Sequence, residues 1–493
     1  MVESPLQIGM GYCCWDCVLS IIEDVKEGRE INPMLTALKN EHLACGQRLM
    51  KDLRIDINKA VRIHTNGTDF TPLIRSALKG NTDYVRLLLA DSRVEVNKPT
   101  TDGETPLYVA ANQGHEECVR LLLADPRVDV NKATTDNGET PLYAAAYEGH
   151  TGCVRLFLAD ARVEVNKARM EDGETPLYVA ADQGHEECVR LLLADPRVKV
   201  NKARTNDGTT PLYAAAVQGH EECVRLLLAD PRVEVNKATK NAETTPLYSA
   251  AFEGRTECVR LFLADARVEV NKATTYDGTT PLYVAAHFGH EECVRLLLAD
   301  TRVDVNKAST DYGGTPVSAA AGQGHTECVG LLLADPRVGV NQKGFDGDTP
   351  LLTAACCGHA DIVKLLLMDD ILSLMAEFPT WRGIVLTALL CNTAFTPPLP
   401  LLVWKFIFSF LRPRTDANAR IGLEKHPKSG VGSRLFPGAT ALWVAASKGH
   451  SECVERLLGY EGILRNQSTV DGRTPLMVAT EKGHDQCVAL LSG

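Results

Sequence analysis

Histidine and cysteine, two residue types that bind metal ions, recur together along this chain. A His-x-x-Cys pair occurs at His115 and Cys118 and again at His150 and Cys153. A structural zinc site needs four such ligands, usually supplied as two closely spaced pairs. Each copy of the pattern supplies only two ligands, and no second pair follows at zinc spacing. The sequence therefore predicts no metal ion at these pairs.

A denser group of thiols lies near the amino terminus. Cys13, Cys14 and Cys17 form a Cys-Cys-x-x-Cys motif. Three thiols fall short of the four ligands of a closed zinc site, and no fourth ligand is close to them in the sequence. We therefore predict no metal and no cofactor here either.

Motifs that are typical of enzymes are missing from the sequence. It contains no phosphate-binding G-x-x-x-x-G-K-[ST] loop, no G-x-S-x-G nucleophile motif and no protein-kinase signature. Serine, histidine and aspartate are plentiful, but no spacing places a nucleophile beside a base. We predict that the chain is not an enzyme.

The histidines and cysteines belong to a segment that is repeated along the chain. Thr-Pro-Leu begins at Thr105 and recurs every 35 residues as far as Thr280. Each copy continues with Tyr, a run of small residues, Gly-His (Gly254-Arg255 in one copy) and Cys-Val-Arg-Leu. A fixed period of this size indicates one supersecondary unit stacked on copies of itself. Such a solenoid offers a long open surface rather than an enclosed cavity, which favours binding over catalysis.

One repeat can be interpreted residue by residue. Thr105 suits the N-cap of a first helix and Pro106 its first position, where a missing N–H does no harm. Gly114 suits the left-handed end of that helix. A second helix is expected from about Glu116 to Ala124, followed by an extended arm and a polar turn. The unit is therefore helix, turn, helix, arm and turn tip.

The repeat resembles the ankyrin repeat. Thr105-Pro106-Leu107-Tyr108-Val109-Ala110 matches the ankyrin motif T-P-L-H-x-A except that Tyr replaces His. Gly114-His115 and Val130-Asn131 are similar to the turn and the arm of that family. Because Tyr replaces the family's His, the hydrogen bonds of that His are not carried over. The resemblance implies an all-α ankyrin-repeat solenoid of helix-turn-helix units with short extended arms and turn tips.

The repeat register predicts about twelve units. We expect an N-terminal cap or partial repeat at 1–31, ankyrin repeats 1–10 at 32–369, an interrupting segment at 370–437, and ankyrin repeats 11–12, the last one truncated, at 438–493. In the degenerate repeat 1, Asn32 aligns with the capping Thr, His42 with the repeated His and Cys45 with the repeated Cys.

The interrupting segment contains apolar residues expected to form helices and, from Thr415, a polar stretch expected to be mobile. Trp404, Ile407, Phe408 and Leu411 have the spacing of an amphipathic helix. The favoured interpretation is a helix packed on the exposed end of repeat 10. A membrane span is the weakest alternative, because several prolines and an asparagine interrupt the uncharged run.

The same segment also resembles the opening of an F-box, the helix by which adaptors bind a cullin-type ubiquitin ligase. The residues that carry this resemblance are Leu399, Pro400, Ile407, Phe408 and Leu411. Leu402 replaces the usual acidic residue, and the later helices of an F-box have no counterpart. The resemblance implies an alternative function as a substrate-recognition adaptor, with ubiquitin-ligase subunits as partners.

The charge balance argues against nucleic acid as a partner. The formal net charge is −11, whereas nucleic-acid binding requires a basic face. Each repeat carries a basic pair such as Arg127 and Lys132, but Asp125 and Asp129 accompany it. We therefore expect these charges to form solvated surface, and no nucleic-acid partner.

Cysteine usage and the amino terminus indicate a reducing compartment. Equivalent cysteines on stacked repeats, such as Cys118 and Cys153, lie too far apart for a disulfide, so we expect buried thiols. The amino terminus lacks a basic region followed by an apolar core, so we expect no signal peptide. The predicted location is the cytoplasm or the nucleus.

Positions that differ between repeats are the candidates for partner binding. Internal repeats have the same neighbours, so agreement between copies serves stacking and difference marks positions that are free or used. In ankyrin proteins the ends of the first helices and the turn tips line the concave, partner-binding face, and the resemblance transfers this role. The candidate partner-binding residues are Tyr147, Met170, Phe252, Tyr276, His287, Phe288, Tyr312 and Phe345. The predicted function is a protein–protein interaction scaffold.

Overall fold

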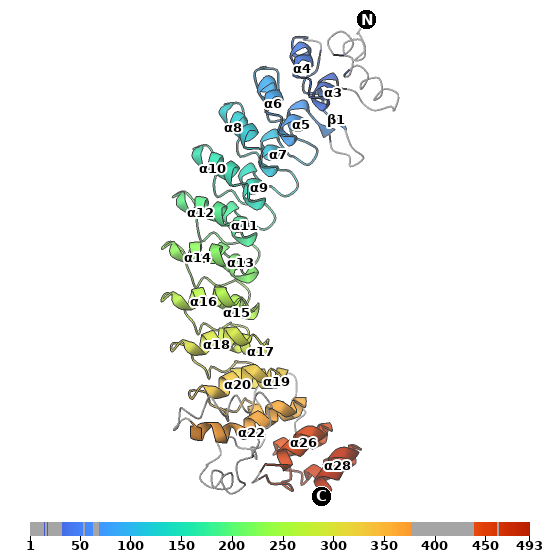
Figure 1. Ribbon diagram of the computed structural model, residues 1–493, viewed down its shortest axis with the longest axis vertical. Coiled ribbons are helices and arrows are strands. Elements are labelled where there is room, and N and C mark those ends of the chain that lie inside the picture. Colours follow the sequence, from blue (N-terminus) through green and yellow to red (C-terminus); the bar gives the residue numbers. More distant parts are fainter. Residues whose placement is uncertain are drawn as a thin grey trace, which may run out of the picture. The chain divides into compact units, whose positions relative to one another are not determined.

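The computed structural model describes residues 14, 17, 32–52, 55–62, 69–375, 438–460 and 463–493. Within these ranges the chain forms 24 helices, which follow one another in pairs, and one short two-stranded sheet (Figure 1). The contacts between residues divide it into two compact units, Met1–Lys240 and Asn241–Gly493. The all-α repeat fold expected from the sequence is confirmed.

The first unit contains repeats 1 to 6. Its helices are α3 (Pro33–Lys39), α4 (Leu43–Met50), α5 (Pro72–Leu78), α6 (Thr82–Leu89), α7 (Pro106–Asn112), α8 (Glu116–Ala124), α9 (Pro141–Tyr147), α10 (Thr151–Ala159), α11 (Pro176–Asp182), α12 (Glu186–Ala194), α13 (Pro211–Gln218) and α14 (Glu221–Ala229). Strands β1 (Val61–Arg62) and β2 (Asp69–Phe70) pair antiparallel just before repeat 2.

The second unit contains repeats 7 to 12. Its helices are α15 (Pro246–Phe252), α16 (Thr256–Ala264), α17 (Pro281–His287), α18 (Glu291–Ala299), α19 (Pro316–Gln323), α20 (Thr326–Ala334), α21 (Pro350–Cys357), α22 (Ala360–Met375), α25 (Ala441–Lys448), α26 (Ser451–Leu458), α27 (Pro475–Glu481) and α28 (Asp485–Ser492). No helix in the described ranges has the length and apolar content needed to cross a lipid bilayer.

Each helix pair forms for the local reasons expected from the sequence. The Thr105 hydroxyl accepts a hydrogen bond from the N–H of Tyr108 at 3.2 Å, and Pro106 is the first residue of α7. Gly114, with φ +74°, reverses the chain between α7 and α8. A Cβ at that position would lie 2.6 Å from the ring of His150 in the next repeat, so glycine is also required for stacking.

Within each unit the buried side chains lie between neighbouring repeats. In repeat 3, Leu107, Ala110 and Ala111 of α7 are buried, as are the Cys118, Val119 and Leu122 side chains of α8. Helix α7 packs between α5 and α9, and α8 between α6 and α10. Alanine on the first helix lets neighbouring backbones approach closely, and each repeat buries its apolar side chains mainly against adjacent repeats.

The repeated Arg and Asn residues hold neighbouring repeats together. The Arg127 guanidinium pairs with the Asp125 carboxylate at 2.6 Å and donates to the carbonyl oxygen of Leu89, near the end of α6, at 2.9 Å. The Asn97 side chain donates to the Arg127 carbonyl at 2.7 Å and accepts the N–H of Asp129 at 2.8 Å. Arg127 is exposed, as expected, but it also caps the preceding repeat, a role not expected from the sequence.

Tyrosine, in place of the family's histidine, also connects repeats. The Tyr108 hydroxyl donates to the Glu139 carboxylate of the next repeat at 2.7 Å. Where repeat 5 meets repeat 6, the Tyr178 and Thr209 hydroxyls lie 3.2 Å apart. The substitution therefore changes the hydrogen-bond partners and keeps a polar link between successive first helices.

Repeat 11 stacks directly on repeat 10 in spite of the interruption in the sequence. Helix α25 packs on α21 and α26 on α22. The imidazole Nε2 of His450 lies 3.1 Å from the carbonyl oxygen of Cys356, the contact that joins repeats elsewhere. The end of repeat 10 is therefore covered by repeat 11, so the expectation that this end is exposed is wrong. The helix expected at Trp404, Ile407, Phe408 and Leu411 lies outside the described residues.

The boundaries of the last units differ slightly from the sequence-based ones. Helix α22 runs to Met375, beyond residue 369 where repeat 10 is expected to end. Helix α28 ends at Ser492 with Gly493 as its C-cap. The second helix of repeat 12 is therefore eight residues long, the same length as α26. The expected cap at residues 1–31 lies outside the described residues except for Cys14 and Cys17.

Candidate functional site

The candidate partner-binding residues are side chains exposed to solvent. Tyr147, Met170, Phe252, Tyr276, Phe288, Tyr312 and Phe345 make up seven of the ten exposed large hydrophobic side chains in the part of the chain that the structure describes. His287 is half-buried. A criterion based only on differences between repeats therefore selects most of the exposed large hydrophobic side chains of those ranges.

The structure brings three of these residues together on repeats 7 and 8, in the second unit. Phe252 ends α15, His287 ends α17 and Phe288 is the C-cap of α17. The rings of Phe252 and Phe288 meet edge to face with centroids 4.6 Å apart, and those of His287 and Phe288 lie 4.9 Å apart. We call Phe252, His287 and Phe288 the aromatic cluster. Edge-to-face packing at these distances is favourable.

The aromatic cluster carries little positive charge at neutral pH. Burial lowers the pKa of His287 below its ordinary value, and the neighbouring His325 adds a smaller effect in the same direction. The neutral imidazole stacks on the ring of Tyr283 with centroids 6.3 Å apart. The cluster therefore presents an uncharged aromatic surface.

At the position of Phe252, the contact with the next repeat is made by the backbone carbonyl and does not involve the side chain. The carbonyl oxygen of Phe252 lies 2.8 Å from Nε2 of His290 in the next repeat. In repeat 3 the equivalent residue is Asn112, whose carbonyl oxygen lies 3.0 Å from Nε2 of His150. Because both residues make the same backbone contact, their different side chains are not needed for it.

Tyr147 lies at the equivalent position of repeat 4, in the first unit. Its ring stacks on Tyr143 with centroids 6.5 Å apart, and its carbonyl oxygen lies 2.8 Å from Nε2 of His185. It is 44% exposed. Tyr147 therefore shares the geometry of Phe252, but among the described residues its ring contact is with the buried Tyr143 rather than with a second exposed aromatic ring.

The other candidates lie on the turn tips. The Met170 N–H donates to the Asn137 carbonyl at 2.9 Å, and the Phe345 N–H donates to the Tyr312 carbonyl at 3.0 Å, so each tip is attached to the preceding one. Met170, Tyr276 and Tyr312 are between 62% and 80% exposed. Their backbones are held in place while their side chains project into solvent.

The grooves described in the first unit lie between second helices and recur with the repeat. A groove of about 570 Å³ between α10 and α12 is lined by Leu158, Leu191 and Arg197, among others. Grooves with equivalent linings recur between α6 and α8 and between α12 and α14. Because they repeat with the stacking, we attribute them to the spacing of second helices rather than to a substrate site.

The repeat cysteines are thiols enclosed in the core. Cys118, Cys153, Cys188, Cys293, Cys328, Cys453 and Cys487 are free and buried. Burial raises the pKa of Cys153 to about 12, so its thiol carries almost no reactive thiolate at neutral pH. These cysteines serve the packing, as expected.

A different group of thiols comes together at the amino-terminal end of the first unit. Cys14, Cys17, His42 and Cys45 place their sulfur and imidazole nitrogen atoms within 4.8 Å of one another. The hydrogen bond from the Cys17 N–H is the main cause that lowers the pKa of the Cys14 thiol to about 7.

The prediction of no metal at the amino-terminal thiols assumed that further ligands were missing, and that assumption is wrong because the fold supplies His42 and Cys45. The His-x-x-Cys pair of repeat 1, considered together with Cys14-x-x-Cys17, was the pattern that could have revealed them.

The residues that resemble an F-box, Leu399, Pro400, Ile407, Phe408 and Leu411, lie outside the described residues. The adaptor interpretation therefore stays a prediction from the sequence.

Comparison with known families agrees with the fold. A family model described as ankyrin repeats (three copies) matches residues 92–169, 122–204, 161–239, 232–309, 301–374 and 418–493, more than half of the chain. No curated protein matches the sequence. Ankyrin repeats are general protein–protein interaction modules and typically have no enzymatic activity. With six helix pairs described in each of its two units and these matches, the chain belongs to the ankyrin-repeat family.

Proposed function

We propose that this chain is a protein–protein interaction scaffold that binds a partner protein on the face formed by the first-helix ends and turn tips. The family resemblance predicts that this face is concave. The aromatic cluster is the observation that carries the proposal, since the Phe252 and Phe288 rings pack together and remain 40% and 45% exposed. Aromatic side chains of this kind are enriched at the energetic centres of protein interfaces.

The chemistry of the cluster suggests the kind of partner. Phe252 and Phe288 offer apolar rings, and the lowered pKa of His287 keeps that imidazole neutral at pH 7. A partner that inserts an apolar or aromatic side chain fits this surface better than one that presents an acidic group. Tyr276 and Tyr312 on the tips are suited to adaptable polar and apolar contacts at the rim.

The test combines partner capture with a double variant. Proteins retained by the immobilised full-length chain are identified by mass spectrometry, and the affinity of the strongest purified partner is measured by calorimetry. Phe252→Ala/Phe288→Ala should weaken its binding at least about 30-fold, the equivalent of one interface hot spot. The variant should stay folded and its melting temperature should fall only slightly, because repeat stacking at Phe252 uses its carbonyl oxygen and only the ring contact with Phe288 is lost.

A matched control changes exposed apolar residues elsewhere. Leu464→Ala/Met477→Ala alters two exposed side chains of repeats 11 and 12 and should leave the affinity unchanged. If the cluster variant binds every partner as tightly as the unaltered chain, the proposal is wrong.

We also propose a reducing compartment, the cytoplasm or the nucleus, as the location of the protein. The free thiols of the buried repeat cysteines support this proposal. Microscopy of the tagged full-length chain would test it, and secretion into the medium would contradict it.

A further inference from the structure

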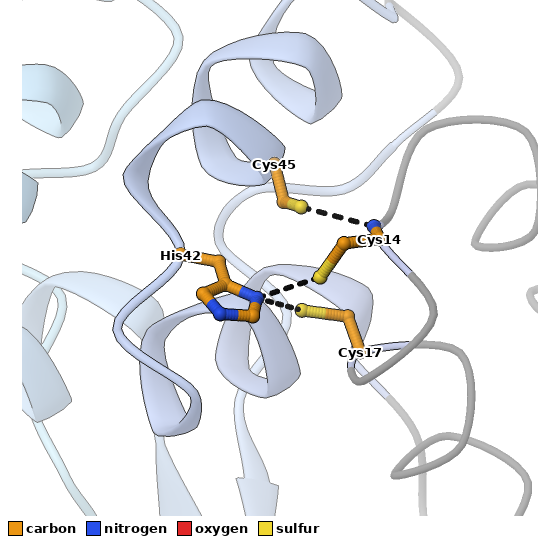
Figure 2. A group of neighbouring side chains, drawn as sticks. All are labelled: Cys14, Cys17, His42 and Cys45. Atoms are coloured by element: carbon orange, nitrogen blue, oxygen red, sulfur yellow. Dashed lines mark hydrogen bonds between the residues drawn. The ribbon is translucent and has the colours of Figure 1, made fainter.

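Four potential metal ligands from two segments converge beside repeat 1. Cys14 and Cys17 come from the amino-terminal segment, His42 is the N-cap of α4 and Cys45 lies in its first turn (Figure 2). The Nδ1 atom of His42 is 2.6 Å from Sγ of Cys14 and 3.3 Å from Sγ of Cys17. All four ligand atoms point toward one common space.

The types and spacing of these ligands match a structural zinc site. Three thiolates and one imidazole form a Cys₃His set, which binds Zn²⁺ tetrahedrally. Zinc–sulfur bonds of about 2.3 Å and zinc–nitrogen bonds of about 2.0 Å separate tetrahedral ligand atoms by roughly 3.5 to 3.8 Å. The observed separations, from 2.6 Å to at most 4.8 Å, lie on both sides of this range. Side-chain rotations that move the ligand atoms by about 1 Å would therefore complete the tetrahedron.

Repeat 1 uses its His-x-x-Cys pair differently from the interior repeats. In repeat 3, Nε2 of His115 lies 3.1 Å from the Leu78 carbonyl oxygen of repeat 2, and Sγ of Cys118 lies 3.9 Å from the Thr82 hydroxyl. Each of those residues therefore already contacts the preceding repeat. His42 instead turns its Nδ1 atom toward the two thiols of the amino-terminal segment.

The surroundings favour thiolates at the site. The Cys14 N–H donates to Sγ of Cys45 at 3.2 Å, and the Asn40 side-chain amide donates to Sγ of Cys17 at 3.6 Å. Hydrogen bonds from N–H groups to ligand sulfurs stabilise the deprotonated form and orient the ligands around a metal. Cys17 and Cys45 are buried, which suits a closed structural site rather than one open to substrate.

Repeat 1 keeps the left-handed turn that precedes the repeated His in the interior repeats. Glu41 has φ +56°, while the equivalent residues of the interior repeats are glycines such as Gly114. A side chain in this conformation is unfavourable, yet the turn is kept, and it directs His42 toward the thiols.

We infer that Cys14, Cys17, His42 and Cys45 bind one Zn²⁺ ion with tetrahedral geometry, and that this ion attaches the amino-terminal segment to repeat 1. Terminal repeats of a solenoid have one stacking face without a neighbouring repeat and need a cap. The zinc site supplies this attachment with ligands that the repeat already encodes, and it is independent of partner binding on repeats 7 and 8.

The experiment measures zinc directly. The full-length chain, purified under reducing conditions without a histidine tag, should contain one zinc ion per chain by inductively coupled plasma mass spectrometry. Cys14→Ser and Cys17→Ser should each lower this value to near zero. Cys118→Ser, a thiol of the same His-x-x-Cys pattern in repeat 3, should leave it at one.

Cobalt substitution tests the geometry without any variant. Co²⁺ added to the metal-free chain should produce the intense visible bands of tetrahedral coordination and a sulfur-to-cobalt charge-transfer band, and Zn²⁺ should abolish both. Absence of zinc after incubation with equimolar Zn²⁺, zinc retained by both serine variants, an octahedral cobalt spectrum or bound iron in place of zinc would each overturn the inference. A Cys13→Ser variant that loses zinc while Cys14→Ser keeps it would overturn the ligand assignment.

Discussion

Repeats 1 and 3 contain the same His-x-x-Cys pair in different surroundings. In repeat 3 the His115 imidazole contacts the carbonyl oxygen of Leu78 and Cys118 is buried between helices. In repeat 1 the His42 imidazole faces the Cys14 thiol at 2.6 Å. The comparison shows that a residue repeated for stacking becomes available for other chemistry where the preceding neighbour changes.

The largest effect is expected from removing the metal. A strong chelator should increase amide hydrogen exchange at least about 100-fold in residues 32–52, because structural zinc contributes on the order of 10 kcal/mol to small zinc domains. Exchange in repeats 3 to 6 should hardly change, since their His-x-x-Cys pairs contact protein atoms. Equal exchange in repeat 1 with and without chelator would remove the distinction between the two repeats.

A second comparison uses equivalent leucines. Leu49 in repeat 1 and Leu122 in repeat 3 are both fully buried, and truncation of such a side chain typically costs about 2–5 kcal/mol. Leu122→Ala should lower the main thermal transition, because α8 packs on helices at both sides. Leu49→Ala should affect only an earlier transition of the terminal repeat. A single transition shifted equally by both variants would show that repeat 1 unfolds together with the interior.

Acid should destabilise the interior repeats. Hydrogen bonds from Arg127 and its equivalents lower the pKa of Asp125 and of the corresponding carboxyls at Asp91, Asp160, Asp195, Asp230, Asp265 and Asp300. A carboxyl whose pKa is lowered by folding stabilises the fold above its unfolded pKa of about 3.9, and this contribution is lost as the pH falls through the folded value. Thermal melts should therefore be nearly constant from pH 5 to 7 and fall steeply below about pH 4. A thermal midpoint that does not fall below about pH 4 would contradict the structural role of these pairs.

Removing one such pair gives a smaller effect. Arg127→Ala removes the bonds to Asp125 and to the carbonyl oxygen of Leu89 and should cost about 1 kcal/mol in urea unfolding. Arg120 pairs with the exposed Glu117 on the surface of α8, so Arg120→Ala should cost less than about 0.5 kcal/mol. Equal costs would mean that the contact to the preceding repeat contributes nothing.

The smallest effect is expected at a turn tip. Tyr276 is 80% exposed, so Tyr276→Ser should change the free energy of unfolding by less than about 0.5 kcal/mol. A larger loss would indicate that the tip side chain stabilises the stack and is not free to bind.

The helix pairs could be predicted from the sequence because their determinants are local. Thr105, Pro106 and Gly114 cap, start and end a helix within ten residues, and the same pattern recurs along the chain. The exposure of Phe252 and of its equivalent Tyr147 also followed from the sequence, since positions not needed for stacking are free to differ.

The remaining features depend on contacts between distant residues. Cys14 and His42 are 28 residues apart, and the spacing of two ligand pairs does not show that a fold will bring them together. The contact between His450 and Cys356 spans 94 residues, so the sequence could not show whether the interrupting segment separates repeats 10 and 11. The role of Arg127 was missed because its acceptor lies in the preceding repeat.

The measurement that tests the proposed function most directly is hydrogen–deuterium exchange of the full-length chain with and without its purified partner. The proposal predicts protection of peptides that contain the ends of α15 and α17, residues 245–256 and 280–291, and of the neighbouring tips. It predicts no change in peptides from repeats 11 and 12. Protection confined to the second helices, or absent from repeats 7 and 8, would contradict partner binding at the aromatic cluster.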